Sequence, residues 1–230
     1  MIDVHEWVIL LLVAALVAQD TTAGPQLLVS EPLVSGTLAG WVVGDAYLGL
    51  VMGLAVQLIW SGMMPVGTTL FLDVNVGVIC AVVVAAAMPG SEDHRLLAMG
   101  VALLWMVPVA LLGTGLTELH RRLSDIIVST VRPESAAPRT IAWRHLGGWL
   151  LAGVQGMMTL AFGVALGMVI VPAVTHSLVP IVRADLLWAG ILGTGGGMAV
   201  GVTWHYSRGR ATLLGALLAA GFWALWTYAG

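Results

Sequence analysis

The stretch EPLVSGTLAGWVVGDAYLGLVMGLAVQLIWSG, residues 31–62, contains two apolar segments that meet at Gly44-Asp45. The first segment, residues 32–43, would be about 18 Å long as a helix, because each helical residue adds about 1.5 Å. That length is too short to cross the hydrocarbon core of a bilayer, which is about 30 Å thick. Two helical segments broken in this way are typical of a re-entrant or discontinuous helix, which is tolerated where protein buries the break or a cavity adjoins it.

The composition of the whole chain indicates that its solvent is lipid. Of its 230 residues, 59% are hydrophobic and 9% are charged, whereas a soluble domain carries roughly 25% charged residues. The basic residues are all Arg and the formal charge is −3, so nucleic-acid binding has no electrostatic basis. We expect a single integral membrane domain over residues 1–230, in which residues 26–88 form a hairpin-rich core segment.

Further apolar runs lie before and after the broken hairpin of residues 32–61. The early run 7–18 is short for a full crossing unless Ile2 and Val4 extend it, and 74–88 is another apolar segment. Full membrane spans are predicted at 96–116, 145–171, 186–205 and 211–228. Asp3 and Glu6 stand where a cleavable signal peptide would carry basic residues, so we expect the first run to stay in the mature protein. The predicted fold class is therefore an all-α polytopic membrane protein with full-length transmembrane helices plus short, broken or re-entrant helical hairpins.

The only long hydrophilic stretch, residues 117–144, indicates how the chain is oriented. Apolar residues recur at helical spacing from Leu116 to Ile127, with charged residues on the other face, which predicts an amphipathic helix lying at the membrane surface, followed by a loop. This stretch holds five Arg residues, and Arg208 and Arg210 follow two predicted crossings later. The positive-inside rule places both regions in the cytoplasm.

Glycines recur at four-residue spacing within the broken hairpin and crowd the late span. They are Gly36, Gly40, Gly44, Gly49 and Gly53, and then Gly193, Gly195, Gly196, Gly197 and Gly201. Such faces allow helices to approach each other closely in lipid, and we interpret them as packing surfaces rather than as ligand sites.

Polar residues cluster where the second hairpin segment ends and the next segment begins. They are Gln57, Thr68, Thr69, Asp73 and Asn75. Because a polar group without a partner is costly in hydrocarbon, intramembrane polar residues are functional candidates. Thr68 and Thr69 have loop hydrogen bonding as an alternative role, and Asn75 has helix capping. Asp45 is interpreted as a cap or turn residue at the break.

The sequence lacks the motifs of zinc sites, nucleophilic serine sites and phosphate-binding loops. The six His residues are scattered, with no His-Glu-x-x-His zinc motif, and there is neither a Gly-x-Ser-x-Gly elbow nor a P-loop. A single cysteine, Cys80, cannot form an internal disulfide or a thiolate metal cage. We therefore expect no catalytic residues, no metal and no cofactor.

Residues 26–87 resemble a characteristic stretch of one transporter family, the membrane-embedded enzyme IIC component of the mannose/fructose/sorbose family of sugar phosphotransferase systems (PTS). In that family a Pro-Leu-Val opening, here 32–34, leads through a Gly-Asp break into a Gly-rich helix that ends in Glu or Gln-Leu-Ile, here 57–59. A Gly-Pro-Gly loop and an aspartate follow, and the aspartate here would be Asp73. Glu31 stands where the family commonly has a basic residue or Asn.

The resemblance implies a non-enzymatic transport subunit in the bacterial cytoplasmic (inner) membrane. It would bind and translocate a mannose-type hexose together with a second membrane protein, the IID subunit, as an oligomer of IIC–IID units. Phosphoryl transfer is expected on the soluble IIA and IIB partners. Gln57 and Asp73 would contact the sugar, with Thr68, Thr69 and Asn75 as further candidates. The alternatives are a degenerate IIC-like membrane scaffold or regulatory subunit without transport, and an unrelated small transporter with a similar Gly-rich hairpin.

Overall fold

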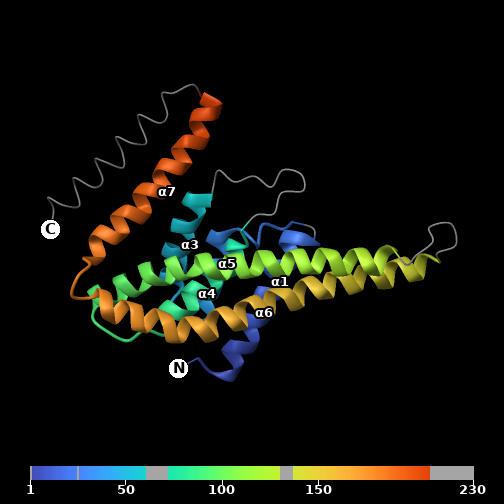
Figure 1. The fold of residues 1–230 in the computed structure, drawn as a ribbon, viewed down its shortest axis with the longest axis horizontal. Coiled ribbons are helices and arrows are strands. Elements are labelled where there is room, and N and C mark those ends of the chain that lie inside the picture. Colours follow the sequence, from blue (N-terminus) through green and yellow to red (C-terminus); the bar gives the residue numbers. More distant parts are fainter. Residues whose placement is uncertain (1, 25, 61–71, 130–136, 208–230) are drawn as a thin grey trace.

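The computed structural model describes residues 2–24, 26–60, 72–129 and 137–207, and its regular structure there is entirely α-helical. This confirms the predicted fold class. The helices are α1 (Val4–Thr22), α2 (Pro32–Val42), α3 (Ala46–Trp60), α4 (Val74–Ala86), α5 (Glu92–Ser129), α6 (Pro138–Leu178) and α7 (Ala184–Ser207) (Figure 1). Helices α1, α5 and α6 are long and apolar enough to cross a membrane. The predicted span 211–228 lies outside the described residues.

Helices α2 and α3 form the predicted broken hairpin, and its turn follows from local chemistry. Gly44 has φ +81°, a left-handed conformation that glycine adopts without steric cost. The Gly44 N–H donates to the Trp41 carbonyl at 3.3 Å, and the Asp45 N–H donates to the Gly40 carbonyl at 2.8 Å, which is the hydrogen-bond pattern of a Schellman helix end. Asp45 then caps α3 by accepting from the Leu48 N–H at 3.0 Å, as expected for this residue.

The glycines of the hairpin bring the two helix backbones together. A Cβ atom at Gly40 would lie 2.8 Å from the Gly49 Cα, and one at Gly36 would lie 3.0 Å from the Gly53 Cα. On α7, Gly195 packs against Leu58 of α3. These contacts confirm the packing interpretation for Gly36, Gly40 and Gly195. It is wrong for Gly44, which forms the turn, and for Gly193 and Gly196, which have no described atom within 4 Å of a Cβ position.

Helix α4 lies at the centre of the molecule. Its residues from Val76 to Ala85 are all buried, and it packs against α2, α5 and α6. A helix that is apolar on every side, as this one is, has to be enclosed by other elements. The surrounding helices α1, α5 and α6 turn large apolar side chains outward, among them Leu12, Leu111 and Val169, as expected for surfaces that face lipid.

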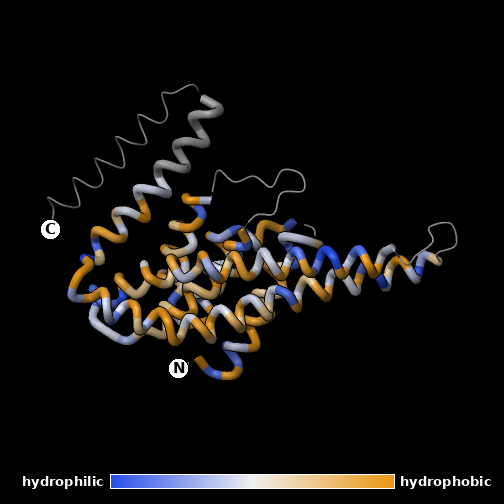
Figure 2. The backbone as a smooth tube through the Cα atoms, viewed as in Figure 1, coloured by the Kyte–Doolittle hydropathy of each residue, from blue (hydrophilic) through white to orange (hydrophobic). Residues whose placement is uncertain are grey.

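Helices α5 and α6 lie side by side along the long axis of the molecule and exceed the thickness of a bilayer (Figure 1). With 38 and 41 residues they are about 57 Å and 62 Å long, against about 30 Å of hydrocarbon. Hydrophilic residues collect toward the ends that residues 130–136 connect (Figure 2). The expected separate amphipathic helix after Leu116 is wrong in its boundary: residues 117–129 continue α5, and 138–144 begin α6.

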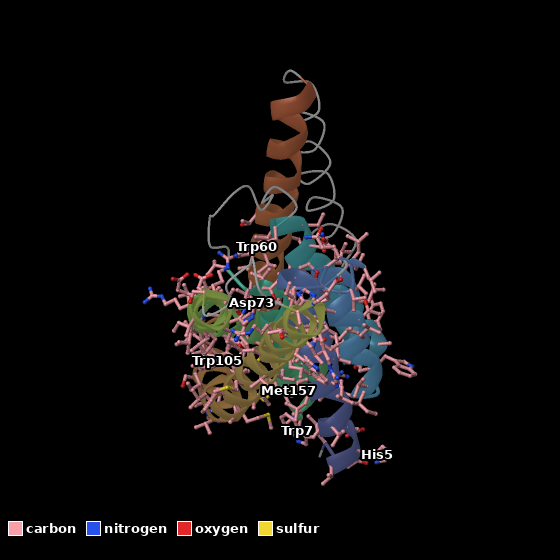
Figure 3. The ribbon with its side chains drawn as sticks, turned by 90° about the vertical axis from the view of Figure 1, so that its right-hand side faces the viewer. His5, Trp7, Trp60, Asp73, Trp105 and Met157 are labelled. Carbon is pink, nitrogen blue, oxygen red and sulfur yellow. The ribbon has the colours of Figure 1, made fainter. Side chains whose placement is uncertain are left out.

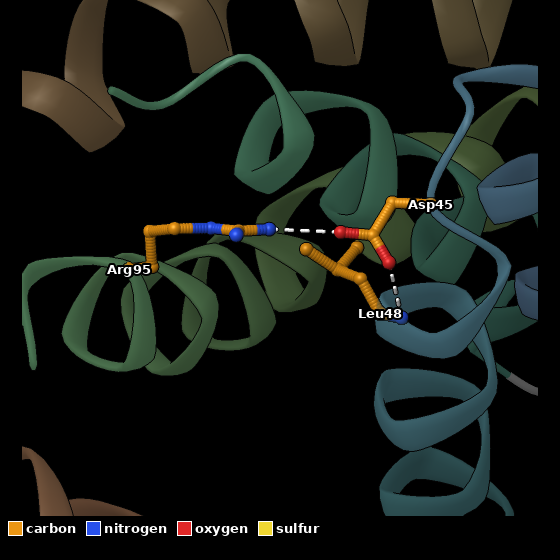
Figure 4. A network of polar contacts seen from close by, with 3 residues as sticks. All are labelled: Asp45, Leu48 and Arg95. Atoms are coloured by element: carbon orange, nitrogen blue, oxygen red, sulfur yellow. Dashed lines mark hydrogen bonds and ion pairs between the residues drawn. The ribbon is translucent and has the colours of Figure 1, made fainter. Parts of the chain in front are cut away.

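The tip of the α2–α3 hairpin is joined to α5 by an ion pair. The Arg95 guanidinium donates to the second Asp45 carboxylate oxygen at 2.8 Å, while the first oxygen caps α3 (Figure 4). The side chains are 47% and 33% exposed. An ion pair this exposed stabilises a fold by about 0.5 kcal/mol, whereas an N-cap contributes about 1 kcal/mol.

Substitutions at Asp45 separate these two contributions. Asp45→Asn retains an oxygen that can cap α3 but loses the ion pair, so we expect a free energy of unfolding about 0.5 kcal/mol lower. Asp45→Ala loses both, and we expect a decrease of about 1.5 kcal/mol. Thermal unfolding of the purified variants in detergent, with Arg95→Gln as the matched control, measures the difference. Equal effects of the Asn and Ala variants would show that the cap contributes nothing.

Candidate functional site

The candidate polar residues lie where helix ends converge inside the apolar bundle. Asp73 lies among the packed helices, whereas His5 and Trp7 lie at the far end of α1 (Figure 3). The end of α1, the start of α2 and the start of α4 all pack together. The polar residues Gln57, Asp73 and Asn75 are half-buried at these helix ends.

Asp73 is held between the start of α4 and the middle of α5. It is the N-cap of α4, where one carboxylate oxygen accepts from the Val76 N–H at 3.4 Å. Its own N–H donates to the Thr114 hydroxyl at 3.2 Å and lies 3.4 Å from the Ala110 carbonyl. A Cβ atom at Gly113 would lie 2.8 Å from Asp73 Oδ2, so only glycine leaves room for this carboxylate.

Gln57, near the end of α3, contacts the start of α2. Its Nε2 donates to the Glu31 carboxylate at 2.7 Å, and its Oε1 accepts from the Leu33 N–H at 3.3 Å. The amide therefore satisfies a backbone donor in the first turn of α2, which has no side-chain cap of its own. The sequence did not predict the partnership with Glu31.

Asn75 connects α4 to α1. Its Nδ2 donates to the Thr21 hydroxyl at 3.3 Å, and its main-chain carbonyl accepts from the Ser35 hydroxyl of α2 at 3.3 Å. The alternative role of Asn75 as a helix cap is wrong, because Asp73 occupies the N-cap position of α4. Asn75 instead holds three helices together at this end.

The predicted set is thus brought to one region without forming one contact network. Within the described residues, Gln57, Asp73 and Asn75 make no hydrogen bond to one another. Thr68 and Thr69 lie outside the described residues.

Sequence reasoning missed two buried polar residues in this region. Gln155 of α6 is 5% exposed and donates to the Thr117 hydroxyl of α5 at 2.7 Å. Asp20 of α1 is 4% exposed and accepts from the N–H groups of Leu27 and Ser30, which orders the connection to α2. Gln155 is the only Asn or Gln in the predicted span 145–171, and its type and place were a sufficient signal.

The chemistry available here is hydrogen bonding. Carboxylate, amide and hydroxyl groups pair there in part-buried positions, and Gln155 is buried; a hydrogen bond gains strength where water is excluded. No group of three His, Cys, Asp or Glu side chains converges in a way that could hold a metal ion in the described ranges. A hollow of about 660 Å³ lies between the end of α1 and α6; its lining residues include Ala23, His145 and Trp149 but neither Asp73 nor Gln155.

Comparisons with known proteins identify relatives of the whole chain. A family model described as the sorbose-specific IIC component of a PTS system matches residues 4–224. The sorbose-specific EIIC component of Klebsiella pneumoniae is 29% identical over 129 residues, which are 55% of this chain and 45% of that protein. The matched part of the chain therefore spans less than half of that relative's length.

Two solved structures share the fold over nearly the whole chain. One, described as a membrane protein, has a TM-score of 0.67 at 20% identity and covers 99% of this chain and 88% of its own. The other is a complex of the mannose transporter ManYZ with microcin E492, with a TM-score of 0.64 at 19% identity and the same coverage. At these identities the likeness establishes the fold alone.

Proposed function

The chain belongs to the family of sorbose-specific IIC components of the phosphotransferase system, and on that premise we propose that it is the sugar-translocating membrane subunit of a mannose-type complex. In this proposal it binds a hexose and moves it across the bacterial cytoplasmic membrane, paired with a IID subunit. Soluble IIA and IIB partners carry the phosphoryl group to the sugar, so the chain itself needs no nucleophile.

The observation that supports sugar binding is the environment of Asp73. Its carboxylate lies between two apolar helices, and within the described part of the chain a donor is recorded for one oxygen only. A carboxylate in such a place costs free energy unless donors reach it. Sugar hydroxyls are such donors, and hydrogen bonds to a charged acceptor are stronger than those to a neutral one.

The test is to express the chain with its candidate IID subunit, purify the pair in detergent, and titrate it calorimetrically with a panel of hexoses. We expect a stable pair that binds one of them with a micromolar dissociation constant. A chain that purifies without the IID subunit would contradict the proposed pairing.

A second candidate function, a regulatory or scaffold subunit that passes no sugar, is favoured by the Glu31–Gln57 hydrogen bond. At 2.7 Å this bond commits the Gln57 amide to the protein, and Glu31 stands where the family commonly has a basic residue or Asn. A stable pair that binds no hexose would support this function. Binding restored by Glu31→Asn would assign the loss to this hydrogen bond.

A further inference from the structure

One face of α5 carries a row of small and hydroxyl residues toward α4 and α6. Ala110, Gly113, Thr114 and Thr117 are spaced three and four residues apart, so they lie on the same side of the helix. Helices α4, α5 and α6 all pack on one another. This row is therefore where side chains from α4 and α6 reach the same stretch of α5.

Asp73 and Gln155 approach this row at neighbouring turns. From the α4 side, the Asp73 carboxylate lies against Gly113, and its N–H donates to Thr114. From the α6 side, Gln155 Nε2 donates to the Thr117 hydroxyl at 2.7 Å and lies 3.4 Å from the Gly113 carbonyl. Gly113 is thus a neighbour of both side chains.

The Gln155 amide is only half satisfied. Its Nε2 donates to the Thr117 hydroxyl and lies 3.4 Å from the Gly113 carbonyl, whereas its Oε1 is buried and has no donor in the described part of the chain. A buried acceptor without a donor costs about 1–3 kcal/mol. The amide therefore presents an acceptor, Oε1, that lacks a donor among the described residues.

Asp73 also presents an acceptor at this place. Its Oδ1 accepts from Val76, and no donor to its Oδ2 is recorded among the described residues. Two acceptors beside one glycine suit a ligand that offers donors. Neighbouring hydroxyls of a neutral sugar provide them, and each hydroxyl can turn to suit the acceptor it meets.

We propose that Gln155 is a sugar-binding residue, whose Oε1 accepts a hydrogen bond from one hydroxyl of the bound hexose while Asp73 accepts from another. The site then extends from α4 across Gly113 of α5 to α6. This inference rests on the proposed function and adds a contact outside the segment 26–88. It also gives Gly113 a role, which is to leave room for the Asp73 carboxylate at this place.

The test measures whether the effect of substituting Gln155 on the dissociation constant depends on one particular sugar hydroxyl. Wild-type and Gln155→Met complexes, purified with the IID subunit, are titrated with the hexose that the wild type binds and with its monodeoxy analogues. We expect Gln155→Met to weaken binding of the parent hexose about five- to tenfold, the usual value for one hydrogen bond. One analogue should then bind both proteins equally, because its missing hydroxyl is the partner of Oε1.

Two further variants guard against a purely structural effect. Gln155→Glu retains an oxygen acceptor, and we expect it to keep the dependence on that one hydroxyl. Thr159→Val is the matched control, because Thr159 is fully buried one turn along α6 and its hydroxyl donates to the Gln155 carbonyl within the helix. This variant should bind every analogue as the wild type does.

The outcomes separate this inference from the function on which it rests. If Gln155→Met weakens binding of every analogue by the same factor, or of none, Oε1 does not contact the sugar and the inference is wrong. Sugar binding by the wild type, with loss in Asp73→Asn, would leave the proposed function intact in that case. If the wild-type complex binds no hexose, the proposed function and this inference fall together.

Discussion

Replacing Asp73 with Asn is expected to weaken hexose binding by the purified complex about 30-fold. A hydrogen bond to a charged acceptor contributes about 1.5–3 kcal/mol, and the Asn amide would turn an N–H₂ donor toward the position of the Oδ2 acceptor. Sugar uptake by cells that carry the variant should fall to background. Calorimetric titration of the detergent-purified pair measures the first effect, and uptake of radiolabelled hexose measures the second.

Asn is chosen because it should leave the stability of the protein unchanged, so that weaker binding reports on the site. Asp73 is the N-cap of α4, and Asn caps helices about as well as Asp, whereas Ala at such a position costs about 1 kcal/mol of stability. Asp45→Asn is the matched control, because Asp45 caps α3 in the same way, at the tip of the α2–α3 hairpin. We expect Asp45→Asn to bind sugar as the wild type does. Equal binding by the wild type and Asp73→Asn would remove Asp73 from the site.

The broken hairpin was predictable because its determinants are local. Gly44 and Asp45 are adjacent in sequence, and the left-handed residue and the cap act on the helices that they join. The glycine spacing on either side is equally visible in the sequence. Local patterns of this kind need no knowledge of what the segment packs against.

The parts of the candidate site that sequence reasoning missed depend on contacts between distant segments. Gln57 meets Glu31 across 26 positions, and Gln155 meets Thr117 across 38. No spacing rule connects such pairs; only the packing of α2 on α3 and of α5 on α6 does. The boundary placed at Leu116 was wrong for a related reason. The change from apolar to amphipathic sequence after Leu116 indicates where the helix surface becomes exposed to water, not where the helix ends. Helix α5 continues through it because α6 packs along it.

Gly49→Ala is the substitution for which we expect the largest loss of stability. The added Cβ atom would lie 2.8 Å from the Gly40 Cα and 3.0 Å from the Gly40 nitrogen. Both are backbone atoms, so no side chain can rotate away and α2 has to separate from α3. Overpacking of this severity costs about 3 kcal/mol, which corresponds to a midpoint of thermal unfolding about 6–12 °C lower in a chain of this size.

The comparison with Gly193 decides whether this loss comes from the close approach of the two helices or from glycine chemistry in general. Gly193 is also a helical glycine in an apolar segment, but no atom of the described residues lies within 4 Å of the position its Cβ would take. Gly193→Ala should leave the midpoint unchanged or raise it slightly, because Ala favours a helix over Gly by about 1 kcal/mol. A similar midpoint for both variants would mean that the hairpin relaxes at little cost in free energy. The close packing of α2 on α3 would then not be what fixes the turn at Asp45 and the position of Gln57 near the end of α3.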